Sequence, residues 1–290
     1  MSIVQAALDR VKATRDQGNP AVAPKAGSPP AVVSPAPVEW PRRSGAEVKI
    51  DMHALHERGL CPDASNTSRH QDEFRRLRRD VLGAMRARAD DGGGVISPVV
   101  LVTSPMPGDG KSWTALNLAL SIAAIDEPDV LLVDADPYKG TLSSALGIRE
   151  APGLLDLLRS PALEFTEVAV PTSVRRLHVI AAGHNNGEVG DLFTAERVGS
   201  LFGSIARTMA GHVVIVDSVP ILVSSETGTL TDVAGQVLLV VRSGVTLRES
   251  VLDAIQRVRS SVPVGLVLNA WRPMLKSESA PYQAYETYRK

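Results

Sequence analysis

The sequence predicts an α/β domain with a doubly wound, mostly parallel β-sheet that is flanked by helices. Three observations lead to this prediction. Runs of consecutive apolar residues recur along the chain, helical segments separate several of them, and a Gly/Pro-rich turn joins the first run to a helix. Continuous apolar strands are typical of parallel sheets that are covered on both faces, and alternating strands and helices are typical of doubly wound folds.

The expected elements follow from apolar runs and from apolar residues at helical spacing. The expected strands are 99–103, 129–136, 177–181, 213–217, 237–241 and 264–268. The expected helices are 68–89, the segment after the turn up to residue 122, 153–159, 195–209 and 246–261.

Composition limits the classes of function. The net charge is −1, so we expect no general attraction to nucleic acid and no nucleic-acid partner. A single cysteine, Cys61, excludes a disulfide framework and an internal Cys-x-x-Cys metal site. The sequence has no secretory signal and no apolar stretch of about 18 residues, so we expect a cytoplasmic protein without a membrane span.

Four regions differ in composition. Residues 1–17 predict a short amphipathic helix, and 18–47 read as a Pro/Ala-rich disordered linker, with seven of the twenty prolines between Gly18 and Pro41. Residues 48–274 form the expected folded domain, and 275–290 form a tyrosine-rich tail with little to bury.

The helix 68–89 has one apolar stripe and many arginines. The stripe is formed by Phe74, Leu77, Val81, Leu82 and Met85. Glu73, Arg76 and Arg79 lie at i, i+3 and i+6 along one side. This side could be a solvated basic face, a nucleic-acid contact or a subunit interface, and composition alone favours the solvated face.

The turn after strand 99–103 has the context of a phosphate-binding loop. Gly110, Lys111 and Ser112 match the pattern G-x-x-x-x-G-K-[ST], whereas Pro105 takes the place of its first glycine. Backbone N–H groups and the helix start would hold phosphate oxygens. Lys111 would reach the β- and γ-phosphates, and the Ser112 hydroxyl would ligate Mg²⁺.

Three carboxylates are expected at the same edge of the sheet as this loop. Asp134 and Asp136 come at the end of strand 129–136, and Asp217 ends strand 213–217. Asp217 suits a Mg²⁺-water contact. Asp134 and Asp136 could divide metal coordination and proton acceptance between them, although Asp136 could instead cap the next segment.

Tyrosines are concentrated in the tail. Three of the four tyrosines of the chain, Tyr282, Tyr285 and Tyr288, fall within its last nine residues. They could accept phosphate or form an aromatic patch that binds a partner. A tyrosine hydroxyl, with a reference pKa near about 10, needs a carboxylate to take its proton during phosphoryl transfer.

Together these motifs resemble the bacterial tyrosine kinases of capsule and exopolysaccharide loci, whose P-loop domain is related to MinD-type ATPases. The resemblance runs from about residue 48 to 290. SPMPGDGKSW looks like the Walker A loop, VLLVDADPYKGTL like Walker A′, and VVIVDSVP like Walker B. EFRRLRR carries the Glu-x-x-Arg-x-x-Arg oligomerisation motif at Glu73, Arg76 and Arg79, and YQAYETY looks like the autophosphorylated cluster. The segment VKIDMHALHERGLCP looks most like the variant of exosortase (PEP-CTERM)-associated loci.

The resemblance implies an ATP- and Mg²⁺-dependent autokinase with the MinD-like P-loop NTPase fold. Each subunit of a ring-like oligomer would phosphorylate Tyr282, Tyr285 and Tyr288 of its neighbour. Lys111, Asp134, Asp136 and Asp217 would be catalytic, with Ser112, Asp134 and Asp217 on the metal and Asp134 as the base. The implied nucleotide-binding residues are Gly108, Asp109, Gly110, Lys111, Ser112, Trp113 and Asn269.

The resemblance also implies partners. A membrane chain-length-determinant protein (a polysaccharide co-polymerase) would activate the kinase and recruit it to the inner face of the plasma membrane. A tyrosine phosphatase would reverse the modification, and the cycle would regulate exopolysaccharide polymerisation and export.

One departure from the family pattern and two alternative functions accompany the resemblance. Tyr138, Lys139 and Gly140 stand where the family usually has an Arg-containing segment that ends in Pro. The first alternative is a MinD/ParA-like ATPase switch without kinase activity. Such switches carry a second loop lysine where this chain has Met106, which favours the kinase. The second alternative is a regulatory ATPase whose tail is a docking strip.

Overall fold

The structure is a computed structural model. It describes residues 38, 40, 47–62, 67–90, 97–126, 128–187, 189–259 and 261–271, all within one compact unit, Ser34–Lys290. The predicted N-terminal helix, most of the predicted linker and the tyrosine tail lie outside the described residues. Within the described part, no helix combines the length and the apolar character needed to cross a membrane.

A seven-stranded sheet forms the centre of the described residues, and its strand order is β3-β4-β2-β5-β1-β6-β7. The strands are β1 (Val99–Thr103), β2 (Val130–Ala135), β3 (Val170–Pro171), β4 (Leu177–Ile180), β5 (Val213–Ser218), β6 (Gln236–Arg242) and β7 (Val264–Asn269). Every neighbouring pair is parallel except β3 with β4. The predicted doubly wound, mostly parallel sheet is therefore confirmed.

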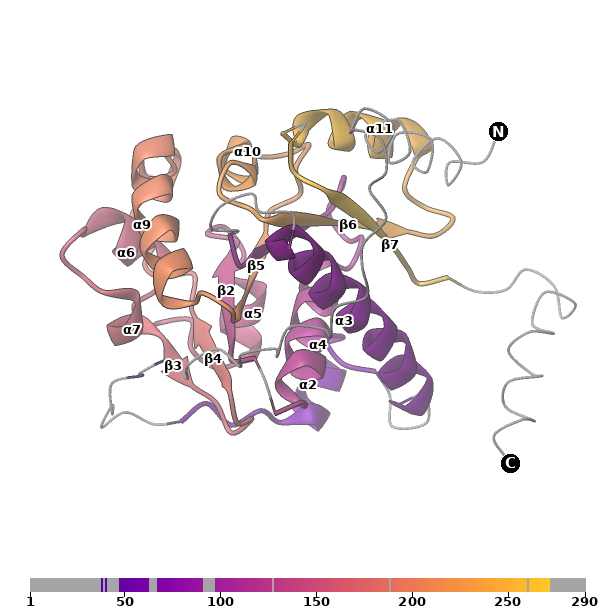
Figure 1. The fold of residues 1–290 in the computed structure, drawn as a ribbon, viewed down its shortest axis with the longest axis horizontal. Coiled ribbons are helices and arrows are strands. Elements are labelled where there is room, and N and C mark those ends of the chain that lie inside the picture. The colour runs from indigo at the N-terminus through magenta and orange to yellow at the C-terminus, as the bar shows by residue number, and fades with distance from the viewer. Residues whose placement is uncertain are drawn as a thin grey trace, which may run out of the picture. The chain divides into compact units, whose positions relative to one another are not determined.

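Helices cover both faces of this sheet (Figure 1). They are α2 (Met52–Glu57), α3 (Thr67–Asp90), α4 (Lys111–Ala123), α5 (Thr141–Ala145), α6 (Leu154–Arg159), α7 (Phe165–Val168), α8 (Val189–Leu192), α9 (Ala195–Thr208), α10 (Ser225–Thr231) and α11 (Arg248–Arg257). The long helices agree with the prediction. The short helices α2, α5, α7, α8 and α10 were not predicted, because one or two turns show too little apolar periodicity to be recognised.

Two apolar cores lie on opposite faces of the sheet, because successive side chains of a strand point to opposite sides. In β1, Val99 and Leu101 belong to the core under α6, α9 and α11, whereas Val100 and Val102 belong to the core under α3 and α4. All four side chains are almost completely buried. This two-sided burial explains why the strands read as continuous apolar runs.

Helix α3 packs along α4 through its predicted apolar stripe (Figure 1). Phe74 and Val81 are buried, and the other three stripe residues pack against the same core. Trp113, in the first turn of α4, contacts the rings of His70 and Phe74 at centroid distances of 5.7 and 5.1 Å. These contacts fix α3 beside the start of α4.

Packing on the domain also includes two residues of the segment predicted as linker. Trp40 stacks on the imidazole of His178 with a centroid distance of 3.8 Å and meets Phe165 edge-on. The backbone N–H of Val38 donates to Asp129 Oδ2 at 3.2 Å. Residues 38 and 40 therefore contact the core through a backbone hydrogen bond and an aromatic ring.

Candidate nucleotide-binding site

Two of the predicted carboxylates lie side by side at the carboxyl edge of the sheet. Asp134 of β2 and Asp217 of β5 are direct partners in the parallel register. Two residues before each carboxylate, the strand carries an apolar side chain that packs into the core under α4. These side chains are Leu132 in β2 and Ile215 in β5. Because side chains alternate along a strand, both carboxylates lie on the side of the sheet that α4 covers.

The loop between β1 and α4 has the backbone that phosphate binding requires. Gly108 and Gly110 have φ values of +88° and +97°, in the region that favours glycine, and Gly110 is the N-cap of α4. A Cβ atom at Gly110 would also collide with the side-chain amide of Asn269. The loop therefore ends at the N-terminus of α4, where backbone N–H groups of the first turn can bind an anion.

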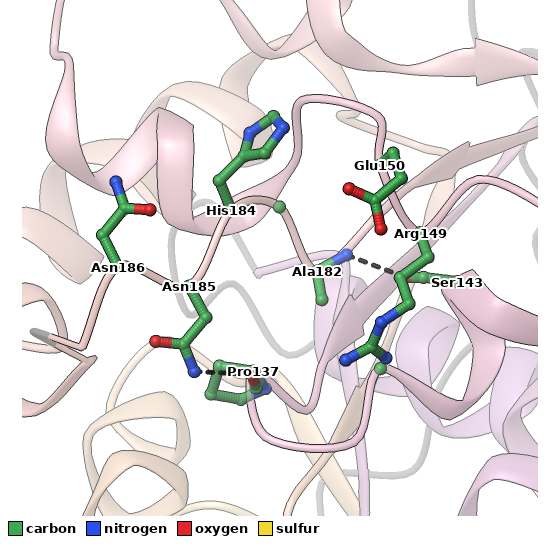
Figure 2. A pocket seen from close by; sticks show the side chains of 10 residues that line it. Pro137, Ser143, Arg149, Glu150, Ala182, His184, Asn185 and Asn186 are labelled. Carbon is green, nitrogen blue, oxygen red and sulfur yellow. Dashed lines mark hydrogen bonds between the residues drawn. The ribbon is translucent and has the colours of Figure 1, made fainter.

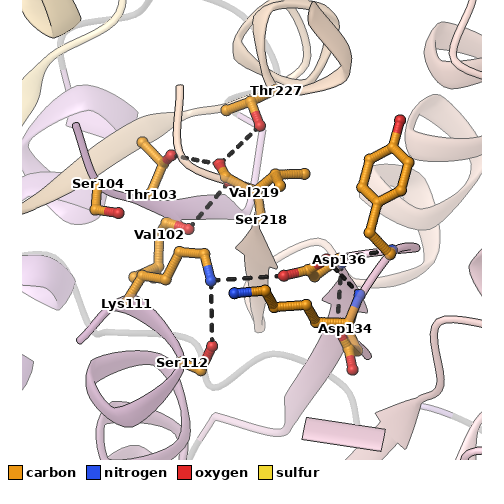
Figure 3. A network of polar contacts seen from close by, with 12 residues as sticks. Val102, Thr103, Ser104, Lys111, Ser112, Asp134, Asp136, Ser218, Val219 and Thr227 are labelled. Atoms are coloured by element: carbon orange, nitrogen blue, oxygen red, sulfur yellow. Dashed lines mark hydrogen bonds and ion pairs between the residues drawn. The ribbon is translucent and has the colours of Figure 1, made fainter. Parts of the chain in front are cut away.

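Lys111 begins α4 and connects the loop to the carboxylates (Figure 3). Its Nζ lies 3.7 Å from Asp136 Oδ2 and 3.5 Å from Ser112 Oγ. The Lys111 side chain is 13% exposed, and the Asp136 side chain is 2% exposed. The structure thus brings together Lys111, Ser112 and Asp136, which the sequence assigned to one site.

Asp134 is held firmly by its neighbours. Its Oδ2 accepts hydrogen bonds from the backbone N–H and the hydroxyl of Ser143, at 2.8 and 2.7 Å, and its Oδ1 accepts from the N–H of Asp136 at 3.1 Å. Burial raises the pKa of Asp134, although the Ser143 bonds oppose this shift. Ser143 was not predicted as a site residue.

Asp136 caps the next segment, which is one of the roles that the sequence left open for it, and it also pairs with Lys111. Its Oδ1 accepts hydrogen bonds from the backbone N–H groups of Tyr138 and Lys139, at 3.2 and 3.0 Å, and so caps the turn after β2. Its Oδ2 pairs with Lys111. One carboxylate therefore shapes the loop and contacts the phosphate-loop lysine.

Asp217 differs from both, because neither of its carboxylate oxygens has a hydrogen-bond partner among the described residues although the side chain is fully buried. Burial raises its pKa to about 7, and the charges of Asp134 and Asp136 add to this rise. The charge of Lys111 opposes it, and so does the nearby Ser112 hydroxyl, whose placement falls short of hydrogen-bond geometry. A buried carboxylate without donors is costly, so this group is suited to a cation that would occupy its lone pairs.

These residues fit Mg²⁺ in a nucleotide complex. The Ser112 hydroxyl and the free Asp217 oxygens are hard oxygen ligands of the kind that Mg²⁺ prefers. Among the described residues, no group of three or more His, Cys, Asp or Glu side chains could hold a metal. Mg²⁺ sites in nucleotide complexes use one or two carboxylates and complete their shell with phosphate oxygens and water.

Residues from β6, β7 and the turn after β6 brace the phosphate-binding loop. The buried Asp109 accepts a hydrogen bond from the hydroxyl of Thr246 at 2.7 Å, and its carbonyl accepts from Asn269 Nδ2 at 2.8 Å. Arg242 Nη1 donates to the carbonyl of Gly108 at 3.4 Å. Asn269 and Asp109 were predicted to contact nucleotide, whereas Thr246 and Arg242 were missed because no local motif marks them.

A cavity of about 250 Å³ is lined by residues of the turn after β2 and of the segment that follows β4 (Figure 2). Among the residues that line it, Asn185 Nδ2 donates to the carbonyl of Pro137 at 3.0 Å. Arg149 Nη1 donates to the carbonyl of Lys139 at 2.5 Å. Ser143, which holds Asp134, also lines the cavity. Side chains around this cavity therefore support the turn that carries Asp136.

The predicted oligomerisation residues lie on the side of α3 that faces away from its apolar stripe. Arg76 and Arg79 are exposed, and Arg79 Nε lies 3.7 Å from Asp80 Oδ1. Glu73 is about half-buried and accepts a hydrogen bond from Arg69 at 3.1 Å. The side chains of this face are thus accessible in the single chain.

No protein-family model matches the chain. A proposed tyrosine-protein kinase, EpsB of Ralstonia nicotianae, is 32% identical over 239 residues, which is 79% of this chain and 30% of EpsB. The tyrosine-protein kinase YwqD of Bacillus subtilis is 29% identical over 192 residues, 65% of this chain and 79% of YwqD. This chain thus spans less than a third of the length of EpsB but most of the length of YwqD.

Two solved kinase domains have a similar structure. The BceF tyrosine kinase domain matches with a TM-score of 0.58 and 29% identity, over 68% of this chain and 76% of that one. The kinase domain of the Escherichia coli tyrosine kinase ETK matches with a TM-score of 0.55 and 23% identity, over 68% and 79%. The fold is that of these tyrosine kinase domains. The relatives named here are bacterial tyrosine-protein kinases or proposed ones, as the sequence motifs predicted.

Proposed function

We propose that this chain is an ATP-dependent protein-tyrosine kinase that phosphorylates Tyr282, Tyr285 and Tyr288 of a neighbouring copy. The observation that carries the proposal is Asp217, a buried carboxylate without a partner, close to Lys111 and Ser112 of a phosphate-binding loop. A site of this kind is suited to a magnesium–nucleotide complex. The similarity to tyrosine-protein kinases, together with the tyrosine-rich tail, supports the choice of acceptor.

In this proposal the loop residues Gly108, Asp109 and Gly110 and the first turn of α4 hold the phosphates of ATP, and Lys111 contacts the β- and γ-phosphates. Trp113 and Asn269 complete the nucleotide-binding set. Mg²⁺ would be held by Ser112, Asp217 and Asp134, and when bound it neutralises charge on the phosphate oxygens.

The transfer itself needs a proton acceptor and charge stabilisation. The phenolic oxygen of the acceptor tyrosine forms a bond to the γ-phosphorus while the bond from that phosphorus to the bridging oxygen breaks. ADP leaves with the electron pair of the broken bond, and the phenolic proton passes to Asp134. Asp134 would accept this proton as a carboxylate, and Lys111 would stabilise the developing negative charge.

The same proposal includes the setting of the reaction. Glu73, Arg76 and Arg79 would pair between neighbouring subunits of a ring-like homo-oligomer, so that each tail enters the next site. We further propose a cytoplasmic kinase of the exosortase-associated type. A membrane chain-length-determinant protein would recruit and activate it, a tyrosine phosphatase would reverse its modification, and the cycle would regulate exopolysaccharide polymerisation and export.

The test is phosphotyrosine mapping by mass spectrometry after incubation of the full chain with Mg-ATP. The variant Lys111→Met should abolish the signal, since Lys111 is expected to contact the transferred phosphate. Lys49→Met is the matched control, because Lys49 is exposed and lies outside the site. Phosphate on Tyr282, Tyr285 or Tyr288 in the wild type and in Lys49→Met alone is the expected result.

Two other outcomes would contradict the kinase proposal. ATP hydrolysis that depends on Lys111 but leaves no phosphotyrosine would indicate a MinD/ParA-like ATPase switch. The triple replacement of the tail tyrosines by Phe adds a second criterion. If it leaves the oligomeric state in Mg-ATP unchanged and no phosphotyrosine forms in the wild type, the tail is a docking strip.

A further inference from the structure

Tyr138 is the chain's fourth tyrosine and does not belong to the tail. Its side chain is 53% exposed, yet its hydroxyl donates a hydrogen bond of 2.5 Å to Oε1 of Glu226. Glu226 is 6% exposed and lies in the first turn of α10, where the Ser224 hydroxyl donates to its other oxygen. The hydroxyl of an exposed tyrosine ring is thus hydrogen-bonded to a buried carboxylate that is 88 residues away in the sequence.

The backbone of Tyr138 continues this connection into the candidate site. Its N–H donates to Asp136 Oδ1 at 3.2 Å, and Asp136 Oδ2 lies 3.7 Å from Lys111 Nζ. A chain of polar contacts therefore runs from Glu226 through Tyr138 and Asp136 to Lys111. It joins α10, which follows β5 and Asp217, to the turn after β2 and to the phosphate-binding loop.

The charges of the two partners favour a strong hydrogen bond. Burial acts to raise the pKa of Glu226, but the hydroxyls of Ser224 and Tyr138 outweigh it, so its pKa is lowered and the carboxylate is ionised at neutral pH. The hydrogen bond to Glu226 raises the pKa of Tyr138 to about 12, with further contributions from burial and from the charges of Glu226 and Asp136. The hydroxyl is therefore a donor, and a bond to an ionised acceptor is stronger than one between neutral groups.

We propose that Tyr138 and Glu226 form a latch between the turn after β2 and α10, and that this latch positions Asp136 against Lys111. Both are positioning residues, since they act through Asp136, and the proposal rests on the nucleotide site proposed above.

The kinetic test compares Tyr138→Phe, which removes only the hydroxyl, with Glu226→Gln, which removes the charge, and with the double variant. Glu196→Gln is the matched control, because Glu196 is an exposed glutamate in the first turn of α9. Each latch variant should lower kcat for ATP turnover about tenfold, as expected for loss of a hydrogen bond to a charged group. The Kd for Mg-ATP should stay within about twofold of the wild type, because the loop that holds the phosphates is unchanged.

The double variant decides whether the two residues act as a unit. If they do, its kcat equals that of either single variant. An unchanged kcat in the single variants, or losses that multiply in the double variant, would overturn the latch even if the wild type is an active kinase. Circular dichroism melts of all variants verify that the compared proteins are folded.

A second readout does not depend on activity. In the full chain labelled with ¹³Cζ-tyrosine, NMR at pH 8 to 11 should show one tyrosine still protonated at pH 11. That signal should be missing in Tyr138→Phe and should ionise at lower pH in Glu226→Gln. If the wild type neither binds nor turns over ATP, the proposed function fails, and this titration still judges the latch. A Tyr138 signal that ionises together with the tail tyrosines would overturn it.

Discussion

Two buried aspartates at opposite edges of the sheet have opposite surroundings. Asp129, just before β2 at the amino edge, accepts hydrogen bonds from Arg176 Nη1 at 3.1 Å and from the Val38 N–H at 3.2 Å. Its own N–H donates to His212 Nδ1 at 3.0 Å. Asp217, at the carboxyl edge of β5, has no hydrogen-bond partner for either oxygen among the described residues.

The difference indicates that two side chains of the same type have different roles, one in stabilising the fold and one in binding a ligand. A buried carboxylate with donors on both oxygens stabilises the fold at the place where chain segments meet. A buried carboxylate without donors is destabilising by itself, and such groups cluster at sites that bind a charged ligand. The carboxyl edge is also where ligands of open α/β sheets bind.

The largest expected effect is on catalysis at the carboxyl edge. Asp217→Asn keeps the shape of the side chain but removes the charge that would hold Mg²⁺. We expect ATP turnover to fall by about 10³-fold, the size typical of losing one main electrostatic contact in the transition state. Steady-state assays with saturating Mg²⁺ measure this, and a fall of less than about threefold would remove Asp217 from the site.

The same substitution should stabilise the protein when metal and nucleotide are absent. Because the pKa of Asp217 is raised to about 7, the folded state binds more protons than the unfolded state above about pH 4, so stability falls as pH rises toward 7. The stability gain of Asp217→Asn over the wild type should grow by about 2–3 kcal/mol from pH 5 to pH 8. Urea unfolding in EDTA tests this, and a gain that is independent of pH would contradict the assigned burial effect.

Asp129 should show the reverse pattern, with lower stability and unchanged chemistry. Asp129→Asn removes the charge that pairs with the partly buried Arg176, which should lower the free energy of unfolding by about 2 kcal/mol. The kcat for ATP turnover should stay within about twofold of the wild type. A large loss of kcat in a fully folded Asp129→Asn protein would contradict the purely structural role assigned to Asp129.

The smallest effect is expected at Trp40. Trp40→Ala removes the ring that stacks on His178 and contacts Phe165, and should lower the free energy of unfolding by about 1 kcal/mol. Trp40→Phe, which keeps an aromatic ring, should recover part of that loss. Equal stability of all three proteins would show that the ring contributes nothing to the fold.

The parts of the fold that the sequence predicted are those with local signals. Apolar runs located the strands β1, β2 and β5, and the acidic ends of β2 and β5 placed Asp134 and Asp217 at one edge of the sheet. The sequence did not predict the strand order. That order makes β2 and β5 neighbours and so sets these two carboxylates in register.

The residues that were missed act over long sequence separations. Thr246 braces Asp109 from 137 residues away, and Glu226 meets Tyr138 from 88 residues away. No motif spacing or periodicity records such contacts, because they arise only when the loops of several strands meet at one edge. Ser143, nine residues from Asp134, was missed for a different reason: the short helix α5 that carries it has no apolar period to reveal it.

The measurement that tests the central claim most directly is the Mg²⁺ dependence of ADP binding. Calorimetric titrations of the wild type, Asp217→Asn and Asp129→Asn would be run with Mg²⁺ and with EDTA. We predict that Mg²⁺ tightens ADP binding at least about tenfold in the wild type and in Asp129→Asn, but not in Asp217→Asn. Equal Mg²⁺ effects in all three proteins would contradict the assignment of the unpartnered carboxylate as the centre of a magnesium–nucleotide site.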